Sequence, residues 1–269
     1  MFCPYPSLFD KLARIKSIRT RSSVSFWIPA GGRRFPFLPP AGLARSKAWR
    51  VVISLTLAVA GFCAALGAGA FASTLPRTAE YDYDAPEPGT YLLPVVKAAG
   101  DGQVLDSEGR SCRLEELVRG RVTVLSFIYT RCGSAKACPY ATGVLNQLHR
   151  LSQQDPVLEN NMRLLSLSFD PAHDTPERMA SYASWARGRT NAAPWRFLTT
   201  RSPGELRPIL DAYGQVVDRK QNPADPTGPL NHTLRVFVID RAGNIRNIYS
   251  SGTLDVRLVL ADVKTLLME

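Results

Sequence analysis

The segment "VTVLSFIYTRCGSAKACPY", residues 122–140, joins an apolar run to two cysteines and a proline. The run from Val122 to Tyr129 is rich in β-branched and aromatic side chains, which is typical of a strand covered on both faces. Pro139 favours the first turn of a helix, and apolar side chains then follow at helical spacing to about Ser152. The segment therefore predicts a buried strand, a cysteine-bearing loop and a helix.

The rest of the chain continues this alternation of strands and helices. The patterns predict further strands at 162–169, 195–199, 233–240 and 245–250, and further helices at 175–187, 202–213 and 255–267. Asp106–Gly109, between two short apolar pieces, indicates an N-terminal hairpin. Parallel units followed by a terminal hairpin and helix define the α/β class, here a three-layer α/β/α sandwich with thioredoxin-like topology. In such a sheet, Cys132 and Cys138 lie at the edge where ligands bind.

The positive charge of the chain is concentrated at one end. The formal net charge is +10, but residues 1–72 carry ten of the 33 Lys and Arg residues and only one acid, Asp10. Residues 73–269 carry the other 23 basic residues against 22 acidic ones. The folded part is nearly neutral, so its composition gives no reason to propose a nucleic-acid partner.

Residues 51–72 form an uncharged apolar stretch of 22 residues, long enough to cross a bilayer as a helix. Three basic residues precede it, and the first acid after it is Glu80, which predicts export of the C-terminal part. Two fates fit: an uncleaved single-pass anchor, or a signal cleaved after Ala72. The predicted location is a bacterial-type inner membrane, with the C-terminal domain in the periplasm.

These features divide the chain into four parts. Residues 1–50 are predicted to be a basic cytoplasmic tail, 51–72 the anchor or signal, 73–94 an extended linker and 95–269 the folded domain. Three of the five cysteines fall in the exported part, at positions 112, 132 and 138. Exported cysteines can persist as disulfides, and an odd number leaves one over. Cys112, in the hairpin, is expected to be a partly buried thiol.

The pair Cys132 and Cys138 fits a structural disulfide, a redox pair or two ligands of a metal site. A thiolate at a helix N-terminus is stabilised by the unpaired amides there, and Lys136 adds a positive charge. Six helical steps of about 100° would leave the two sulfurs on different sides of one helix, so Cys132 must lie on a loop that folds back. Because the pair closes a small loop, a purely stabilising disulfide gains little.

A third ligand would come from one of three histidines. His149 is expected at the surface or edge of the helix after Pro139, and His173 lies in a loop at another strand end. His232 follows a long Pro-rich loop, 222–231, and directly precedes a predicted strand, so that loop could hang over the cysteines. Two thiolates and one imidazole suit a thiophilic ion such as Cu(I).

Three segments together resemble the signature blocks of the Sco/SenC family. They are "VTVLSFIYTRCGSAKACP" (122–139), "LLSLSFDPAHDTPERMASYA" (164–183) and "NHTLRVFVIDRAGN" (231–244). That family consists of membrane-anchored, thioredoxin-like copper carriers of cytochrome c oxidase assembly. The resemblance covers about residues 90–267.

By position, the resemblance implies copper ligands at Cys132, Cys138 and His232. Asp170 and Asp174 match the acidic positions of the middle block. Asp170 is expected to orient the site loop without binding the metal. Asp174 is expected either to support the site in the same way or to cap the helix that starts at Thr175.

Two departures set this chain apart from the family pattern. Five residues separate the cysteines, where the family usually has three, and Asn231 stands where an aspartate usually precedes the histidine. Both changes bear on metal affinity and on the reduction potential of the pair.

The resemblance implies a carrier, not an enzyme. Copper, as Cu(I), Cu(II) or both, would pass by ligand exchange to the copper-site subunit of cytochrome c oxidase or to another copper or thiol partner. The alternative is a membrane-tethered thiol–disulfide oxidoreductase without stable metal binding, which would need Cys132 and Cys138 but not His232.

Overall fold

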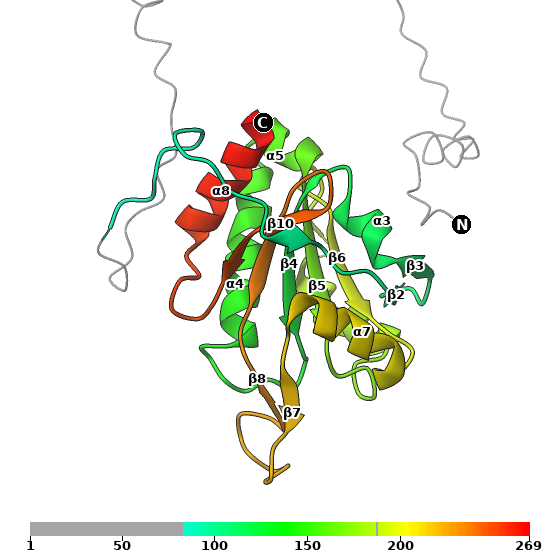
Figure 1. The fold of residues 1–269 in the computed structure, drawn as a ribbon. Coiled ribbons are helices and arrows are strands. Elements are labelled where there is room, and N and C mark those ends of the chain that lie inside the picture. The colour runs from blue at the N-terminus through cyan, green and yellow to red at the C-terminus, as the bar shows by residue number, and fades with distance from the viewer. Residues whose placement is uncertain (1–82, 187) are drawn as a thin grey trace, which may run out of the picture. The chain divides into compact units, whose positions relative to one another are not determined.

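The structure is a computed structural model that describes residues 83–186 and 188–269 (Figure 1). The predicted tail at 1–50 and the apolar stretch at 51–72 lie outside the described residues. Within the described part of the chain, no helix combines the length and apolarity needed to cross a membrane.

An eight-stranded sheet forms the centre of the described domain, in the order β1-β10-β9-β4-β5-β6-β2-β3. Its strands are β1 (Lys97–Ala98), β2 (Gln103–Asp106), β3 (Ser111–Arg113), β4 (Val122–Ile128), β5 (Met162–Ser168), β6 (Trp195–Thr199), β9 (Val236–Ile239) and β10 (Asn244–Tyr249). Strands β4, β5 and β6 are parallel, with Val122 opposite Met162 and Leu164 opposite Trp195. β9 pairs antiparallel with β4 on one side and with β10 on the other, and the β9–β10 pair is the predicted terminal hairpin.

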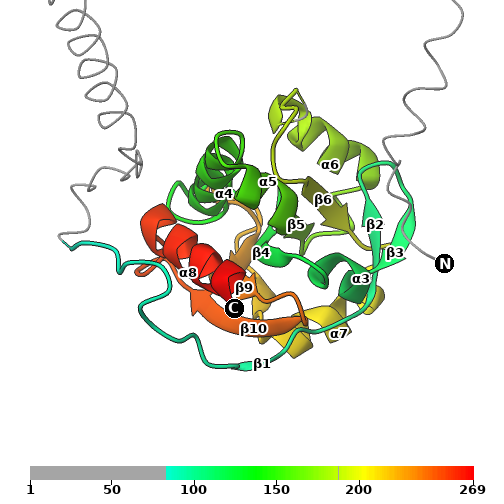
Figure 2. The same ribbon diagram turned by 90° about the horizontal axis from the view of Figure 1, so that it is seen from above.

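Helices cover both faces of this sheet and complete the predicted three layers (Figure 2). The helices are α3 (Leu114–Val118), α4 (Cys138–Ser152), α5 (Pro156–Asn161), α6 (Pro176–Tyr182), α7 (Pro203–Tyr213) and α8 (Val256–Met268). α4 and α8 pack together on one face, while α3 and α7 lie on the other (Figure 2).

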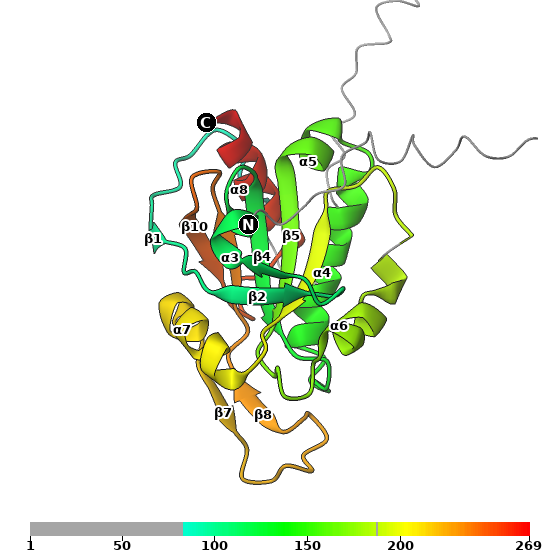
Figure 3. The same ribbon diagram turned by 90° about the vertical axis from the view of Figure 1, so that its right-hand side faces the viewer.

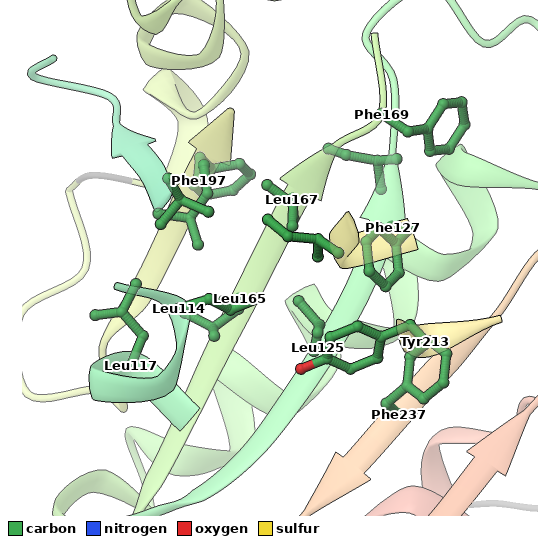
Figure 4. Packing of buried hydrophobic residues seen from close by; sticks show 14 of the residues in the cluster. Leu114, Leu117, Leu125, Phe127, Leu165, Leu167, Phe169, Phe197, Tyr213 and Phe237 are labelled. Carbon is green, nitrogen blue, oxygen red and sulfur yellow. The ribbon is translucent and has the colours of Figure 1, made fainter. Parts of the chain in front are cut away.

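Aromatic side chains fill the core beneath α7, between that helix and the central strands (Figure 4). Phe127 of β4 contacts Tyr213 of α7 and Phe237 of β9 edge-on, with ring centroids 5.3 and 5.8 Å apart. β4 is buried along its whole length, as predicted for a strand covered on both faces. This burial holds the C-terminal end of β4, where the cysteine loop begins, in a fixed position.

The predicted helix starts are confirmed, and one predicted end is wrong. Thr175 and Ser202 cap α6 and α7, each followed by a proline in the first turn. The helix predicted at 175–187 instead stops at Tyr182 and gives way to a 3₁₀ turn, Ser184–Ala186. In that turn, Trp185 packs edge-on against Trp195 of β6, with 5.3 Å between the ring centroids.

A small hairpin flanks the segment predicted to be a loop at 222–231 and includes the last two residues of that segment. β7 (Val217–Arg219) pairs antiparallel with β8 (Leu230–His232) as a separate two-stranded sheet that projects from the end of the domain (Figures 1 and 3). His232 therefore belongs to β8 and not to the entrance of the central strand, which starts at Val236.

The described part of the predicted linker is fastened to the C-terminal helix. The Tyr91 hydroxyl donates to Asp262 at 2.7 Å, and the Gly89 amide donates to the Thr265 hydroxyl at 3.0 Å. Farther along, the Arg246 guanidinium donates to the Leu93 carbonyl at 2.7 Å. The domain therefore has a fixed attachment for the chain that precedes it.

Candidate metal centre

Cys132 and Cys138 flank a compact loop between β4 and α4. The Cys132 amide donates to the Tyr129 carbonyl at 3.3 Å, and the Ala137 amide donates to the Ser134 carbonyl at 3.0 Å. These two turns reverse the chain and bring Cys132 back towards the first residue of α4, which is Cys138. The five intervening residues are therefore accommodated by folding the loop back, as expected from the small side chains of Gly133, Ser134 and Ala135.

The β7–β8 hairpin brings His232 to the two thiols. Its Nε2 atom lies 3.4 Å from Cys138 Sγ and 3.8 Å from Cys132 Sγ. The three potential ligand atoms all lie within 4.8 Å of one another. Both thiols are reduced in the structure. The three predicted ligand residues are thus brought together from three separate elements.

The two thiols have opposite electrostatic environments. A hydrogen bond from Cys138 is the largest cause that lowers the pKa of Cys132 to about 4, with further help from His232 and from the backbone amides of Cys138 and Ser134. The same hydrogen bond, together with burial and the negative charge of Cys132, raises the pKa of the Cys138 thiol. Backbone hydrogen bonds lower the pKa of both thiols, but the hydrogen bond between them, burial and the charge of Cys132 outweigh that effect at Cys138. The thiolate is therefore favoured on Cys132, and not on Cys138 as expected from the helix N-terminus.

Two aromatic rings enclose the imidazole of His232. Its ring centroid lies 5.3 Å from that of Tyr129 and 5.0 Å from that of Phe169. Both aromatic residues follow strands of the central sheet, β4 and β5. Burial, followed by the negative charge of Cys132, raises the pKa of Tyr129 to about 12, so its hydroxyl stays protonated. The rings limit the movement of the imidazole.

Asp174 ties the cysteine loop to the neighbouring strand. Its fully buried carboxylate accepts hydrogen bonds from the Thr130 amide (3.0 Å), the Thr130 hydroxyl (2.5 Å) and the Ser168 hydroxyl (2.6 Å). The expected capping role is wrong, because the Thr175 hydroxyl itself accepts from the Arg178 amide at the start of α6. Asp174 therefore holds Thr130, two positions before Cys132.

Asp170 contacts the same loop from outside. Its carboxylate pairs with Arg131, the residue before Cys132, at 2.6 Å. The Asp170 amide donates to the Ser168 hydroxyl at 3.0 Å. The same hydroxyl donates to the Asp174 carboxylate. The two acids thus support consecutive residues of the loop, and neither carboxylate belongs to the cluster of potential ligands.

The loop of the hairpin, residues 220–229, fastens His232 in place. The Thr227 carbonyl accepts from the Tyr129 hydroxyl at 3.0 Å and from the Gly133 amide at 3.3 Å. Sequence reasoning missed both Tyr129 and Thr227. The only available signal was the length of the Pro-rich loop.

The other singled-out cysteine and histidines lie apart from this cluster. Cys112 is buried in the core on β3, more deeply than expected. His173 contacts the Arg178 guanidinium at 2.9 Å in the loop before α6. His149, expected at the surface or edge, is only 4% exposed.

This geometry defines a class: a thioredoxin-like α/β domain with two thiols and one imidazole gathered at the end of its central strand. The sequence also matches the family model described as SCO1/SenC over residues 97–268, which is more than half of the chain. The chain belongs to the SCO1/SenC family.

Two curated relatives match part of the chain. It is 29% identical over 117 residues to a SCO1 protein homolog of Bacillus subtilis (strain 168), a match that covers 43% of this chain and 56% of that protein. It is 31% identical over 121 residues to a protein of Stutzerimonas stutzeri whose assigned name proposes that it binds copper, covering 44% of this chain and 56% of the relative. The matched part thus spans little more than half the length of these relatives.

Solved structures support the fold. A SCO1/SenC family lipoprotein from Bacillus anthracis str. Ames superposes with a TM-score of 0.54 at 20% identity, over 66% of this chain and 100% of that chain. ScoI of Bradyrhizobium japonicum, solved with copper bound, gives a TM-score of 0.50 at 22% identity, over 62% of this chain and 98% of that chain.

Proposed function

We propose that this protein is a copper carrier that holds the ion through Cys132, Cys138 and His232. The observation that carries the proposal is the gathering of two sulfur donors and one imidazole nitrogen within 4.8 Å of one another. Thiolate sulfur selects Cu(I), and imidazole is also a good copper ligand. The copper-bound Bradyrhizobium relative and the name of the Stutzerimonas relative support the choice of ion.

The surroundings of the cluster suit capture and release of a metal. Cys132 and His232 are partly exposed, whereas Cys138 is buried and fixed at the start of α4. An incoming ion would meet a thiolate at Cys132, because its pKa is about 4. A partner protein could then displace the more exposed ligands first, and the buried sulfur last.

We place the carrier on the membrane, with its domain outside. The uncharged stretch at 51–72 and the basic residues before it support this placement. The recipient that the family suggests is the copper-site subunit of cytochrome c oxidase. Mixing the copper-loaded protein with the soluble copper domain of that subunit should transfer the ion, as measured by the copper content of each protein after separation.

The metal content of purified variants tests the ligand set. Wild-type protein should retain one copper per chain after loading with Cu(I) and desalting, whereas Cys132→Ser and His232→Ala should lose most of it. Two matched controls, Cys112→Ser and His173→Ala, remove a thiol and an imidazole outside the cluster and should retain the ion. Unchanged retention in both His232→Ala and Cys132→Ser would refute the three-ligand site.

A second candidate function is thiol–disulfide exchange, favoured by the asymmetry of the pair. The Cys132 thiolate would attack a partner's disulfide, form a mixed disulfide and release one partner thiolate. Cys138 would then lose its proton and attack Cys132 Sγ, releasing the second partner thiol and leaving the Cys132–Cys138 disulfide. This reaction should survive His232→Ala, and copper retention should not.

A further inference from the structure

A cavity lies away from the cysteines, beside β6. It has a volume of about 380 Å³ and is lined by His149 at the end of α4, by the turn between β2 and β3, and by Ala183, Ala186, Arg189 and residues 192–197. Small-molecule sites commonly have volumes of about 300–1,000 Å³. None of the residues that line the cavity belongs to the candidate metal centre.

Arg189 lines this cavity and is held by neutral groups. Its Nη1 atom donates to Asn146 Oδ1 at 2.5 Å and to His149 Nδ1 at 3.3 Å. Its guanidinium carbon lies 5.9 Å from the ring centroid of Trp185. Among residues 83–186 and 188–269, no carboxylate forms an ion pair with Arg189. A positioned guanidinium with spare donors is a recognition group for a carboxylate or phosphate.

His149 lines the cavity and orients this guanidinium. Burial, and then the charge of Arg189, lower the pKa of His149 to about 4, so the imidazole is neutral near pH 7 and can accept a hydrogen bond from Arg189. The ring also packs edge-on against Trp195, with 5.5 Å between centroids. A neutral imidazole fixes the direction of the guanidinium without supplying a counter-ion.

An aromatic surface forms another part of the cavity lining. Trp195 and Phe197 of β6 stack with their centroids 4.9 Å apart and an interplanar angle of 26°. The Trp195 indole is fixed by a hydrogen bond from Nε1 to the Ser166 hydroxyl at 3.1 Å. The lining therefore offers apolar contact to a planar molecule beside a positive charge.

The two acids of the lining are already paired. Asp106 accepts hydrogen bonds from the amides of Glu108 and Arg110 and from the Arg110 guanidinium. Glu108 pairs with the same guanidinium at 2.9 Å. Both carboxylates therefore pair with Arg110 and neither pairs with Arg189, whose guanidinium is left for another anion.

We propose that this cavity binds a small organic anion, with its acidic group on Arg189 and its planar body against Trp195 and Phe197. The site is independent of the proposed copper function and shares no residue with it. Recognition would require both parts of the molecule, the negative charge and the flat apolar body.

Calorimetric titration of the metal-free, full-length protein tests this site with three probes. The planar carboxylate 2-naphthoate should bind at a single site. The neutral 2-naphthamide, which has the same ring system, and inorganic phosphate, which has the charge alone, should each bind at least tenfold more weakly. Equal affinity for the carboxylate and the amide would refute the role of charge, and phosphate binding as tight as naphthoate would refute the role of the rings.

Variants locate the binding to Arg189. Arg189→Gln should weaken naphthoate binding at least tenfold, whereas Arg150→Gln, on α4 outside the cavity lining, should leave it unchanged. Cys132→Ser should also bind naphthoate normally and thereby separate this site from the metal centre. Wild-type affinity in Arg189→Gln, or loss of binding in Cys132→Ser, would overturn the proposal.

Discussion

Cys138 Sγ lies 3.4 Å from Nε2 of His232, although 94 positions separate the two residues in the chain. The contact depends on two structures of different kinds. Cys138 is fixed by the start of α4 in the main domain, whereas His232 is carried by a two-stranded hairpin outside the central sheet. The integrity of the site therefore depends on how firmly that hairpin is held against the cysteine loop.

Gly228→Ala should detach the hairpin loop. Gly228 has a φ of +97°, and an added Cβ would lie 2.1 Å from the Tyr129 hydroxyl and 2.7 Å from the Arg131 carbonyl. The backbone strain and the clash should together lower the free energy of unfolding by about 1–3 kcal/mol. Copper affinity should fall as well, because His232 follows this loop. Urea unfolding and competition with a Cu(I) chelator measure the two effects.

Gly109→Ala is the matched control for that variant. Gly109 also has a positive φ, +77°, but an added Cβ would meet nothing within 4 Å. The free energy of unfolding of Gly109→Ala should fall by about 1 kcal/mol through backbone strain alone, and the variant should keep its copper affinity. Equal copper affinity in the two variants would show that the hairpin loop does not hold His232.

Asp174→Asn should loosen the cysteine loop where it is tied to β5. The buried carboxylate accepts three hydrogen bonds from Thr130 and Ser168, and an amide cannot accept all of them equally well. We expect the free energy of unfolding to fall by about 2 kcal/mol, with a parallel loss of copper affinity. Glu177→Gln, an exposed change in the same sequence block, should behave like the wild type. A wild-type unfolding curve for Asp174→Asn would contradict the positioning role.

Alkylation of the metal-free protein should follow the pKa values of the two thiols. Iodoacetamide reacts with the thiolate. Because the folded-state pKa of Cys132 is about 4, its rate should rise with pH through 4 and be level from about pH 5.5 upwards. In urea the same thiol should titrate near pH 8.5, the ordinary value. Mass spectrometry should find native labelling at Cys132 before Cys138, and first labelling at Cys138 would reverse the assignment.

Asn231→Asp should weaken the hairpin in this chain. Asn231 pairs with Asp218 across β7 and β8, so an aspartate there would face a like charge. Hydrogen exchange of the hairpin amides should accelerate in Asn231→Asp and return towards wild-type rates in the double variant with Asp218→Asn. No acceleration in the single variant would show that this pair does not govern the hairpin.

The sequence predicted the long elements well because their hydrophobic patterns are strong. Continuous apolar runs mark the buried strands β4 and β5. A capping residue followed by a proline marks the start of α6 and of α7. The short elements α3, α5, β7 and β8 were missed, since three to six residues carry too little periodicity.

The site could be predicted in its residues but not in its electrostatics. The resemblance singled out the two cysteines and His232, yet which thiol is ionised depends on amides and burial that only the folded loop supplies. The same holds for His149, whose environment is formed by Trp195 and Arg189, at least 40 positions away in the chain.

X-ray absorption at the copper edge of the Cu(I)-loaded protein tests the central claim most directly. Two sulfur ligands and one nitrogen ligand are predicted for the wild type, with the nitrogen contribution lost in His232→Ala and kept in His173→Ala. A sulfur-only environment in the wild type, or a nitrogen contribution that persists in His232→Ala, would contradict the account.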